Sequence, residues 1–255
     1  MKNKKIRIAV SGANGRMGKI IIKEIFKIKN IILSILITKK KIKNIQYKNK
    51  NYKIKKCTSL KNQEKNFDVI IDFSEKKNTI KNIKYCVKNK KNIIIGTTGF
   101  NDEEEKFIKL SSKKICIVKS SNFSNGINLI YFILKKIIKK LKDKKIKIKE
   151  EHHKNKKDSP SGTSIEFAKI INKKLRKKFC KNEILKSKNI NFISKRKGNI
   201  IGNHSIIFSD KNEIFKISHK AKNRSIFAIG AIQSAIWCFK KKFGLFSMKN
   251  IINKK

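Results

Sequence analysis

The sequence has few cysteines and no long apolar run, and both shortages restrict its class. No stretch approaches the roughly 20 consecutive apolar residues that cross a bilayer, so we expect no membrane anchor. The first residues lead directly into a strand pattern, without the apolar core and cleavage site of a signal peptide. The five cysteines are scattered without a Cys-x-x-Cys pair, which argues against a disulfide framework and against cysteine metal ligands. We therefore expect a cytoplasmic protein whose cysteines are free thiols and small apolar fillers.

Acids and arginines are also scarce. The chain has 17 Asp and Glu residues against 67 Lys and Arg, a formal net charge of +50, which is typical of nucleic-acid binding. Only five of the basic residues are arginines, and the lysines are spread from end to end. Because arginine makes the bidentate contacts to phosphates and bases, a surface selected for nucleic acid should hold more of it. We attribute the lysines to A/T-rich codons and expect no nucleic-acid partner; a polyanion-binding protein is the alternative.

What the chain does contain is a regular series of short isoleucine-rich runs. Five of them alternate with stretches of helical spacing and are predicted to be strands, at residues 6–10, 31–37, 69–73, 93–95 and 115–118. Strands that alternate with helices form a parallel, doubly wound sheet, so this half predicts an α/β fold. The lysine-rich tract 39–56 is interpreted as solvated loop.

The pattern changes after Asn128. Residues 129–141 have the spacing of an amphipathic helix, and residues 225–239 are predicted to be helical as well. Between them, residues 146–150, 190–195, 204–209 and 213–219 alternate like strands with one buried face. We expect these strands to form an antiparallel or mixed sheet in a second domain.

A glycine-rich turn directly follows the first predicted strand. Gly12, Gly15 and Gly18 are spaced Gly-x-x-Gly-x-x-Gly, with Asn14 where the usual dinucleotide motif has its second glycine. A turn without bulky side chains lets backbone N–H groups and a helix N-terminus face a pyrophosphate, and Arg16 adds a guanidinium. A turn with no ligand is the alternative, but its place after the first strand favours a nucleotide site.

Other predicted strand ends complete the nucleotide hypothesis. The second strand ends in Thr38-Lys39-Lys40, without the acid that usually binds the ribose 2′-hydroxyl, which slightly favours NADPH over NADH. The loops at 96–99 and 121–123 follow two later strands, at the edge where open α/β sheets bind ligands. We interpret them as walls of a nicotinamide pocket.

The segment 150–163 gathers proton carriers, cations and small hydroxyl residues around the only proline. His152 can exchange a proton near neutral pH, and Lys156 offers a cation for a carboxylate, or a proton if neighbouring cations lower its pKa. Ser161, Gly162 and Thr163 precede an apolar stretch, so their N–H groups are expected to cap a helix and bind a carboxylate. A helix cap beside surface histidines is the alternative. Zinc is not expected, because His152 and His153 are adjacent and no cysteine lies nearby.

Taken together, these motifs resemble the bacterial dihydrodipicolinate reductases. The resemblance rests on Gly-Ala-Asn-Gly-Arg-Met-Gly at 12–18, Ile-Gly-Thr-Thr-Gly-Phe at 95–100, Asn-Phe-Ser-Asn-Gly-Ile-Asn at 122–128 and Glu-His-His-x-x-Lys-x-Asp-Ser-Pro-Ser-Gly-Thr at 151–163. Shorter matches at 201–204, 218–221 and 244–246 extend it over nearly the whole chain. The His-His to Ser-Gly-Thr motif is the specific one, whereas the glycine turn occurs in many families.

The resemblance implies an NAD(P)H-dependent reductase that converts dihydrodipicolinate to tetrahydrodipicolinate in lysine and diaminopimelate biosynthesis. It implies a Rossmann-like dinucleotide-binding domain (1–125 and 223–255), a central α+β domain for substrate binding and oligomerisation (126–222), and a homotetramer. By motif position, the catalytic acid/base is His152 and the proton donor Lys156, while the substrate, a small dicarboxylate, contacts His153, Gly162 and Thr163. The implied cofactor-binding residues are Gly12, Ala13, Asn14, Gly15, Arg16, Met17, Thr38, Lys39, Gly96, Thr97, Thr98, Ser120, Ser121, Asn122 and Phe123.

Three departures from the family pattern are visible. The region 185–196 is shorter than the usual arginine- and glycine-bearing segment, Ser120-Ser121 replaces the usual alanine or proline, and Thr38 replaces the usual acid. None of them removes His152 or Lys156. A different dehydrogenase on the same scaffold, acting on another anionic carbonyl or imine compound, is the remaining alternative.

Overall fold

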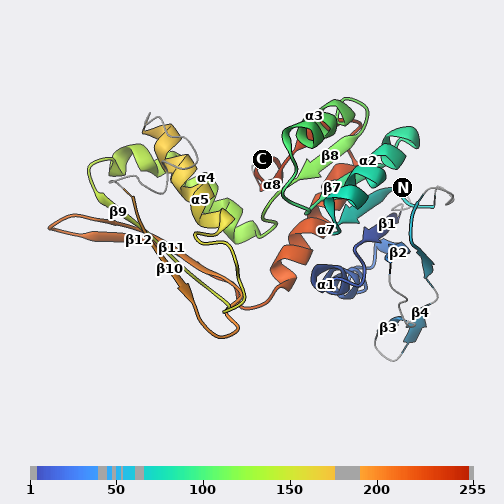
Figure 1. Cartoon of the computed structure of the whole chain (residues 1–255), viewed down its shortest axis with the longest axis horizontal. Coiled ribbons are helices and arrows are strands. Elements are labelled where there is room, and N and C mark those ends of the chain that lie inside the picture. Colours follow the sequence, from blue (N-terminus) through green and yellow to red (C-terminus); the bar gives the residue numbers. More distant parts are fainter. Residues whose placement is uncertain are drawn as a thin grey trace. The chain divides into compact units, whose positions relative to one another are not determined.

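The computed structural model describes residues 5–39, 45–47, 50–52, 54–60, 66–175 and 190–252 (Figure 1). The chain divides into two compact units. The first unit comprises Met1–Ser124 and Ser225–Lys255, and the second comprises Asn125–Arg224. Among the described residues, no helix combines the length and apolar character needed to cross a membrane.

The first unit is built on a seven-stranded sheet in which every adjacent pair is parallel, as predicted. Its strands are β1 (Ile6–Ser11), β2 (Ile31–Ile37), β5 (Lys55–Cys57), β6 (Val69–Asp72), β7 (Asn92–Ile95), β8 (Cys116–Lys119) and β13 (Gly244–Phe246). The strand order is β13-β8-β7-β6-β1-β2-β5. Because β2 lies on one side of β1 and β6 on the other, the order of the chain reverses at β1. Open sheets of this kind bind ligands beyond the carboxyl ends of the strands at that reversal.

Helices cover both faces of this sheet. They are α1 (Arg16–Ile25), α2 (Lys76–Lys88), α3 (Asp102–Ser111), α7 (Ser225–Phe239) and α8 (Met248–Ile252). Ile8 and Val10 of β1 pack in the apolar cluster that contains residues of α1, α7 and α8, whereas Ala9 packs in the cluster under α2 and α3. Strands buried on both faces have continuous apolar sequences, which explains the isoleucine-rich runs.

The second unit has a smaller, mixed sheet of order β10-β9-β11-β12. Only the β10–β9 pair is parallel. The elements of this unit are α4 (Asn125–Ile137), the 3₁₀ turn η1 (Ile138–Leu141), β9 (Lys145–His152), α5 (Gly162–Lys174), β10 (Ile190–Arg196), β11 (Asn203–Ser209) and β12 (Ile214–Lys220). Alternate residues of β9 and β11 are buried, and their apolar members pack with α4 and α5 in one cluster, which confirms the predicted alternation for these two strands. The edge strands β10 and β12 do not alternate between buried and exposed positions in this way.

The prediction of solvated loop over 39–56 was wrong for three short segments. Strands β3 (Ile45–Tyr47) and β4 (Lys50–Tyr52) pair antiparallel, and β5 joins the edge of the main sheet beside β2. Lys55 and Lys56 of β5 are exposed. Lysines are common on edge strands because they oppose pairing with another sheet, so lysine content alone does not exclude a strand. The segment 185–189, within the region expected to be shortened, lies outside the described residues.

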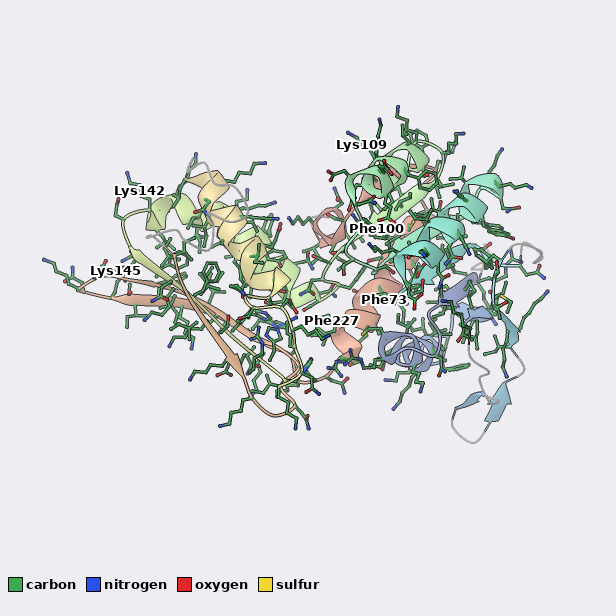
Figure 2. All side chains as sticks on the ribbon, in the orientation of Figure 1. Phe73, Phe100, Lys109, Lys142, Lys145 and Phe227 are labelled. Atoms are coloured by element: carbon green, nitrogen blue, oxygen red, sulfur yellow. The ribbon has the colours of Figure 1, made fainter. Side chains whose placement is uncertain are left out.

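The excess of lysine is accommodated at the surface. Figure 2 shows nitrogen-tipped side chains projecting outward from both units, among them Lys109, Lys142 and Lys145, all of which are exposed. The three apolar clusters of the described residues contain no lysine.

Candidate functional site

The turn after β1 requires glycine for steric reasons. Gly12 has φ of 76°, in the left-handed region, and a Cβ there would lie 2.4 Å from the Phe73 carbonyl oxygen. A Cβ on Gly18 would lie 2.2 Å from the Gly12 carbonyl oxygen. The turn is therefore held close to both α1 and the end of β6, with no room for side chains.

Two backbone N–H groups of this turn bond to β2. Those of Gly12 and Ala13 donate to the Ile37 carbonyl at 3.1 and 3.2 Å. The Ala13 side chain is buried in the core, and Met17 packs against the same cluster. Ala13 and Met17, both predicted to bind the cofactor, therefore contribute to the shape of the turn by packing against the core.

The N-terminus of α1 remains available to an anion. Its N-cap, Gly15, makes no side-chain cap hydrogen bond, and the first turn contains no acid. Helix α3 differs: Asn101 and Glu104 form a reciprocal capping box there. The Gly15 N–H donates to the Gly12 carbonyl at 2.9 Å. The first N–H groups inside the helix, from the exposed Arg16 onward, have no partner within it and suit a phosphate.

Five of the predicted nucleotide residues line one cleft of the first unit; Arg16, which is exposed at the start of α1, is not among its lining residues. Its volume is about 320 Å³, and its walls include Gly12, Asn14, Gly15, Thr38 and Lys39. Sequence reasoning missed five further lining residues: Thr58, which follows β5 beside β2, and Phe73, Ser74, Glu75 and Asn78 on the opposite side. Four of these five follow β6, so the rule that ligands bind beyond strand ends was sufficient to find them.

A buried carboxyl group supports the floor of this cleft. Asp72, the last residue of β6, is fully buried, and its carboxyl accepts from the Ser74 N–H at 2.9 Å, the Ser74 hydroxyl at 2.6 Å and the Asn82 amide at 2.8 Å. The Asn82 amide also donates to the Ser11 hydroxyl at 3.0 Å. Burial raises the pKa of Asp72, and these hydrogen bonds oppose the rise. The network joins the ends of β1 and β6 to α2.

A second cleft lies beyond β7 and β8. It has a volume of about 470 Å³, and its walls include Thr97, Thr98, Ser120 and Ser121 together with Leu245, Phe246 and Asn250. Lys119 and Glu105, which also line it, form an ion pair.

The remaining predicted residues near this cleft have structural contacts. A Cβ on Gly96 would lie 2.3 Å from the Phe73 ring, so this glycine makes room for an aromatic side chain. Phe123 is buried, with its ring centroid 5.6 Å from that of Phe73. The Asn122 side chain accepts from the Ser124 N–H at 2.8 Å and fixes the loop.

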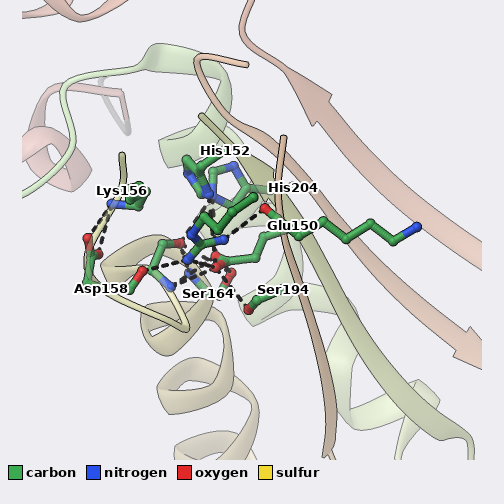
Figure 3. A network of polar contacts seen from close by, with 10 residues as sticks. Glu150, His152, Lys156, Asp158, Ser164, Ser194 and His204 are labelled. Carbon is green, nitrogen blue, oxygen red and sulfur yellow. Dashed lines mark hydrogen bonds and ion pairs between the residues drawn. The ribbon is translucent and has the colours of Figure 1, made fainter. Parts of the chain in front are cut away.

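In the second unit, the centre of the polar network is Glu150, a residue that sequence reasoning passed over (Figure 3). Its carboxylate, 1% exposed, accepts from the Ser161 N–H at 3.0 Å, the Ser164 hydroxyl at 2.6 Å and the Ser194 hydroxyl at 3.0 Å. Arg196 adds a charged donor at 3.0 Å. Burial raises the pKa of Glu150, but the donors from Ser161, Ser164 and Arg196 outweigh it and lower the pKa to about 2. One carboxylate thus joins β9, β10 and the start of α5.

Two buried histidines adjoin Glu150. The rings of His152 and His204 lie 4.9 Å apart in an edge-to-face arrangement, and each histidine is 6% exposed. Burial lowers the pKa of His152 to about 4, although Glu150 opposes the shift. The pKa of His204 is lowered to about 3 by burial and by His152. Both imidazoles are therefore neutral at pH 7, so His152 carries no charge in the pH range where an unperturbed histidine titrates.

Lys156 forms an ion pair with Asp158. The sequence had suggested neighbouring cations, which would lower the pKa of Lys156, as its surroundings. Its ammonium lies 2.7 and 2.8 Å from the two Asp158 carboxylate oxygens. Burial raises the pKa of Asp158, but the hydrogen bonds and charge of Lys156 lower it below its usual value. Lys156 is 22% exposed, so a positive charge is held at the surface of this loop.

Ser161 caps α5 as predicted, with its hydroxyl accepting from the Ser164 N–H. Its own N–H donates to Glu150, however, so this group already binds a carboxylate of the protein. Gly162 is exposed and Thr163 half-buried at the same helix end. The Gly162 N–H also donates to a carboxylate of the protein, because its hydrogen bond is one of those that lower the pKa of Asp158. His153 is half-buried in the loop that follows β9.

The described residues also place three metal-type ligands together. Ligand atoms of Glu150, His152 and His204 lie within 4.8 Å of one another. The Glu150 oxygens already accept four donors, including the Arg196 guanidinium, and a neighbouring positive charge disfavours a cation. We assign no metal to this cluster.

Two family models match this chain, one over most of the first unit's N-terminal segment and one over most of the rest of the chain. The family model "Dihydrodipicolinate reductase, N-terminus" matches residues 6–123, and "Dihydrodipicolinate reductase, C-terminus" matches residues 126–252. The chain is 48% identical to the 4-hydroxy-tetrahydrodipicolinate reductase of Buchnera aphidicola subsp. Cinara cedri, over 100% of this chain and 99% of that one. It is 45% identical to the enzyme of the same name from Wigglesworthia glossinidia brevipalpis, over 100% and 97%.

A solved structure shows the same fold. The dipicolinate-bound dihydrodipicolinate reductase from Paenisporosarcina sp. TG-14 superposes with a TM-score of 0.79 at 24% identity, over 97% of this chain and 99% of that one. With both family models matched in order and full-length relatives above 40% identity, the chain belongs to the dihydrodipicolinate reductase family of oxidoreductases.

Proposed function

We propose that this protein reduces 4-hydroxy-tetrahydrodipicolinate to tetrahydrodipicolinate with NAD(P)H in lysine and diaminopimelate biosynthesis. Loss of water from the hydroxy compound gives dihydrodipicolinate, the conjugated imine that takes up the hydride. The observation that carries the proposal is that the chain matches both halves of the family from residue 6 to residue 252. Each unit also holds the chemistry expected of its half. The first has an uncapped helix N-terminus at a glycine turn, and the second has a neutral imidazole, an ammonium and a capped helix start within one segment.

The cofactor is assigned to the clefts of the first unit. Gly12, Asn14 and Gly15, which line the cleft, and the neighbouring Arg16 would hold the pyrophosphate at the start of α1. Thr38 and Lys39 would lie at the adenosine ribose, and Lys39 slightly favours the 2′-phosphate of NADPH. Thr97, Thr98, Ser120 and Ser121 would flank the nicotinamide. When bound, the nicotinamide supplies the hydride.

Reduction of a conjugated imine ring consumes one hydride and one proton. We assign the proton to Lys156, the cationic group of the segment, whose ammonium is oriented by Asp158. His152 takes the acid/base role as a neutral imidazole, which donates at one ring nitrogen and accepts at the other. Because burial keeps it neutral, it does not add a second positive charge beside Lys156.

The ring carboxylates of the substrate are assigned to the N-terminus of α5. Gly162 and Thr163 present the first helical N–H groups, and His153 lies in the loop before them. Helix N-termini favour anions because the helix dipole is positive there. The Gly162 N–H already faces the Asp158 carboxylate, so a substrate carboxylate would share or displace that contact. Glu150 fixes this helix start from behind through Ser161 and Ser164.

We also propose a cytoplasmic homotetramer assembled through the second unit. Strand β12, at the edge of the mixed sheet, exposes Ile214 and Phe215 at 73% and 41%. Exposed apolar side chains of this size are typical of contacts between copies. Light scattering should give the mass of four chains, and Phe215→Lys should reduce it. An unchanged mass in that variant would show that the contact lies elsewhere.

The test of the reaction is oxidation of NADH or NADPH by freshly generated dihydrodipicolinate. We expect turnover by the unaltered protein, and a loss of about 10²- to 10⁴-fold in kcat for His152→Ala and for Lys156→Met. Lys109→Met, which removes an exposed lysine of α3, is the matched control and should retain full activity. No turnover by folded protein, or full activity in His152→Ala, would overturn the proposal.

A further inference from the structure

An ion pair crosses the cleft assigned to the adenosine end of the cofactor. Lys39, just after β2, and Glu75, just after β6, both line this cleft, and the Lys39 ammonium lies 3.1 Å from a Glu75 carboxylate oxygen. Because β2 and β6 flank β1 on opposite sides, the two charges approach the cleft from opposite walls. Lys39 therefore does not present an uncompensated positive charge to a ligand.

The backbone holds Glu75 in this position while its carboxylate stays out of the helix it precedes. Glu75 is the N-cap residue of α2, yet its side chain makes no cap hydrogen bond. Its carbonyl accepts from the Asn78 and Thr79 N–H groups at 2.9 Å and from the Thr79 hydroxyl at 3.2 Å. The side chains that usually cap a helix are the shorter ones of Asp, Asn, Ser and Thr. Here the carboxylate is instead directed at Lys39.

The pair adds little to folding, because both side chains are well exposed, at 69% and 72%. We expect the pair to affect the binding of ligands in the cleft instead. A ribose with a free 2′-hydroxyl can donate to the Glu75 carboxylate while Lys39 remains paired. A 2′-phosphate gains the Lys39 ammonium but must displace or face the Glu75 carboxylate, which carries the same sign of charge.

We propose that Glu75 is a specificity-determining residue, which supplies the ribose-binding acid that the end of β2 lacks and restrains the preference for NADPH that Lys39 alone would give. The inference rests on the proposed assignment of this cleft to the adenosine end of the cofactor. It makes the opposed pair, rather than Lys39 alone, the determinant of cofactor choice.

Binding measurements test this directly. The dissociation constants of NADH and NADPH are measured by calorimetry for the unaltered protein, Glu75→Gln and Lys39→Gln. A carboxylate within several Å of a phosphate in water-like surroundings changes affinity by about 3- to 10-fold, so Glu75→Gln should raise the NADPH/NADH affinity ratio by that factor. Lys39→Gln should lower the ratio by a similar factor. Glu103→Gln, which removes an exposed acid from the first turn of α3, is the charge-matched control and should leave the ratio unchanged.

Ionic strength separates a charge effect from a structural one. The change in ratio for Glu75→Gln should shrink several-fold between about 20 mM and 500 mM salt, because screening weakens exposed charge interactions. An unchanged ratio in Glu75→Gln, an equal loss of both cofactors, or a ratio change that resists salt would each overturn the inference. These outcomes are distinct from failure of the proposed reaction, because nucleotide affinity is measured without substrate. If neither nucleotide binds the unaltered protein, the cleft assignment and this inference both fall.

Discussion

Replacing Glu150 by glutamine should destabilise the second unit by about 3 kcal/mol at pH 7. Glutamine has nearly the same shape, and the Ser164 hydroxyl can rotate to accept from its amide, so the main loss is the negative charge that Arg196 and the Ser161 N–H bind. The magnitude follows from the pKa of Glu150. A fall from 4.5 to about 2 means that the folded state prefers the ionised form by about 3 kcal/mol, and glutamine approximates the neutral form.

The same reasoning fixes the pH dependence. A lowered folded-state pKa gives stability that is fully present above pH 4.5 and is lost as the pH falls toward 2, so the difference between variant and wild type should shrink by about 2 kcal/mol at pH 3. Urea unfolding with hydrogen exchange of the α5 amides measures the second unit, while fluorescence of Trp237 in α7 monitors the first. Ser194→Ala removes one neutral donor and should cost about 1 kcal/mol. The reasoning is refuted if Glu150→Gln costs less than 1 kcal/mol, or if its cost is unaffected by acid.

Three further outcomes are expected. His152 and His204 should show no NMR titration midpoint above pH 5. Because their unfolded forms protonate near pH 6.5, each histidine should lower the free energy of unfolding by about 2 kcal/mol as the pH falls from 7 to 5. A midpoint near pH 6.5 would contradict the burial argument. Gly12→Ala should lower stability by about 1–3 kcal/mol and weaken NADH binding at least about tenfold, because of its positive φ and the contact with Phe73; calorimetry and thermal unfolding measure both, and wild-type affinity would count against the turn. Gly230→Ala should destabilise α7 although alanine normally favours a helix, because its Cβ would lie 1.9 Å from the Phe123 carbonyl oxygen; a raised Tm would contradict this.

The sequence was sufficient for most of the architecture because five of the seven strands in the main sheet of the first unit are short apolar runs. Burial on both faces makes such runs continuous, and their alternation with helices permits few topologies. The edge strand β5 was missed because its exposed lysines carry no apolar signal. The turn at Gly12 could be predicted for a similar local reason, since the close contacts that require glycine come directly after the first strand.

The centre of the second site could not be predicted in this way. Glu150 is bonded to Ser161, Ser194 and Arg196, which lie 11, 44 and 46 positions away in the sequence. Ser194 meets Glu150 because β10 pairs with β9 in parallel, and His204 meets it because β11 pairs antiparallel. Registers between strands that are distant in sequence are not visible in local patterns. The histidines could be named from the sequence, but their neutral state depends on burial that only the pairing creates.

Because lysine is so abundant in this chain, acidic residues indicate its functional sites better than basic residues do. With 67 Lys and Arg residues among 255, an ammonium near any cleft is expected by chance, so the position of a lysine says little about a ligand. Because the chain has only 17 acids, a carboxylate at a cleft or in a buried network is not expected by chance in the way that a lysine is. Glu150 accepts from Arg196, Asp158 orients Lys156, and the Glu75 side chain lies beside Lys39 without capping its own helix. In each case the carboxylate fixes the position of one cationic side chain. The positions of the carboxylates therefore say more about the cofactor cleft and the Glu150 network than the positions of the lysines and arginines around them.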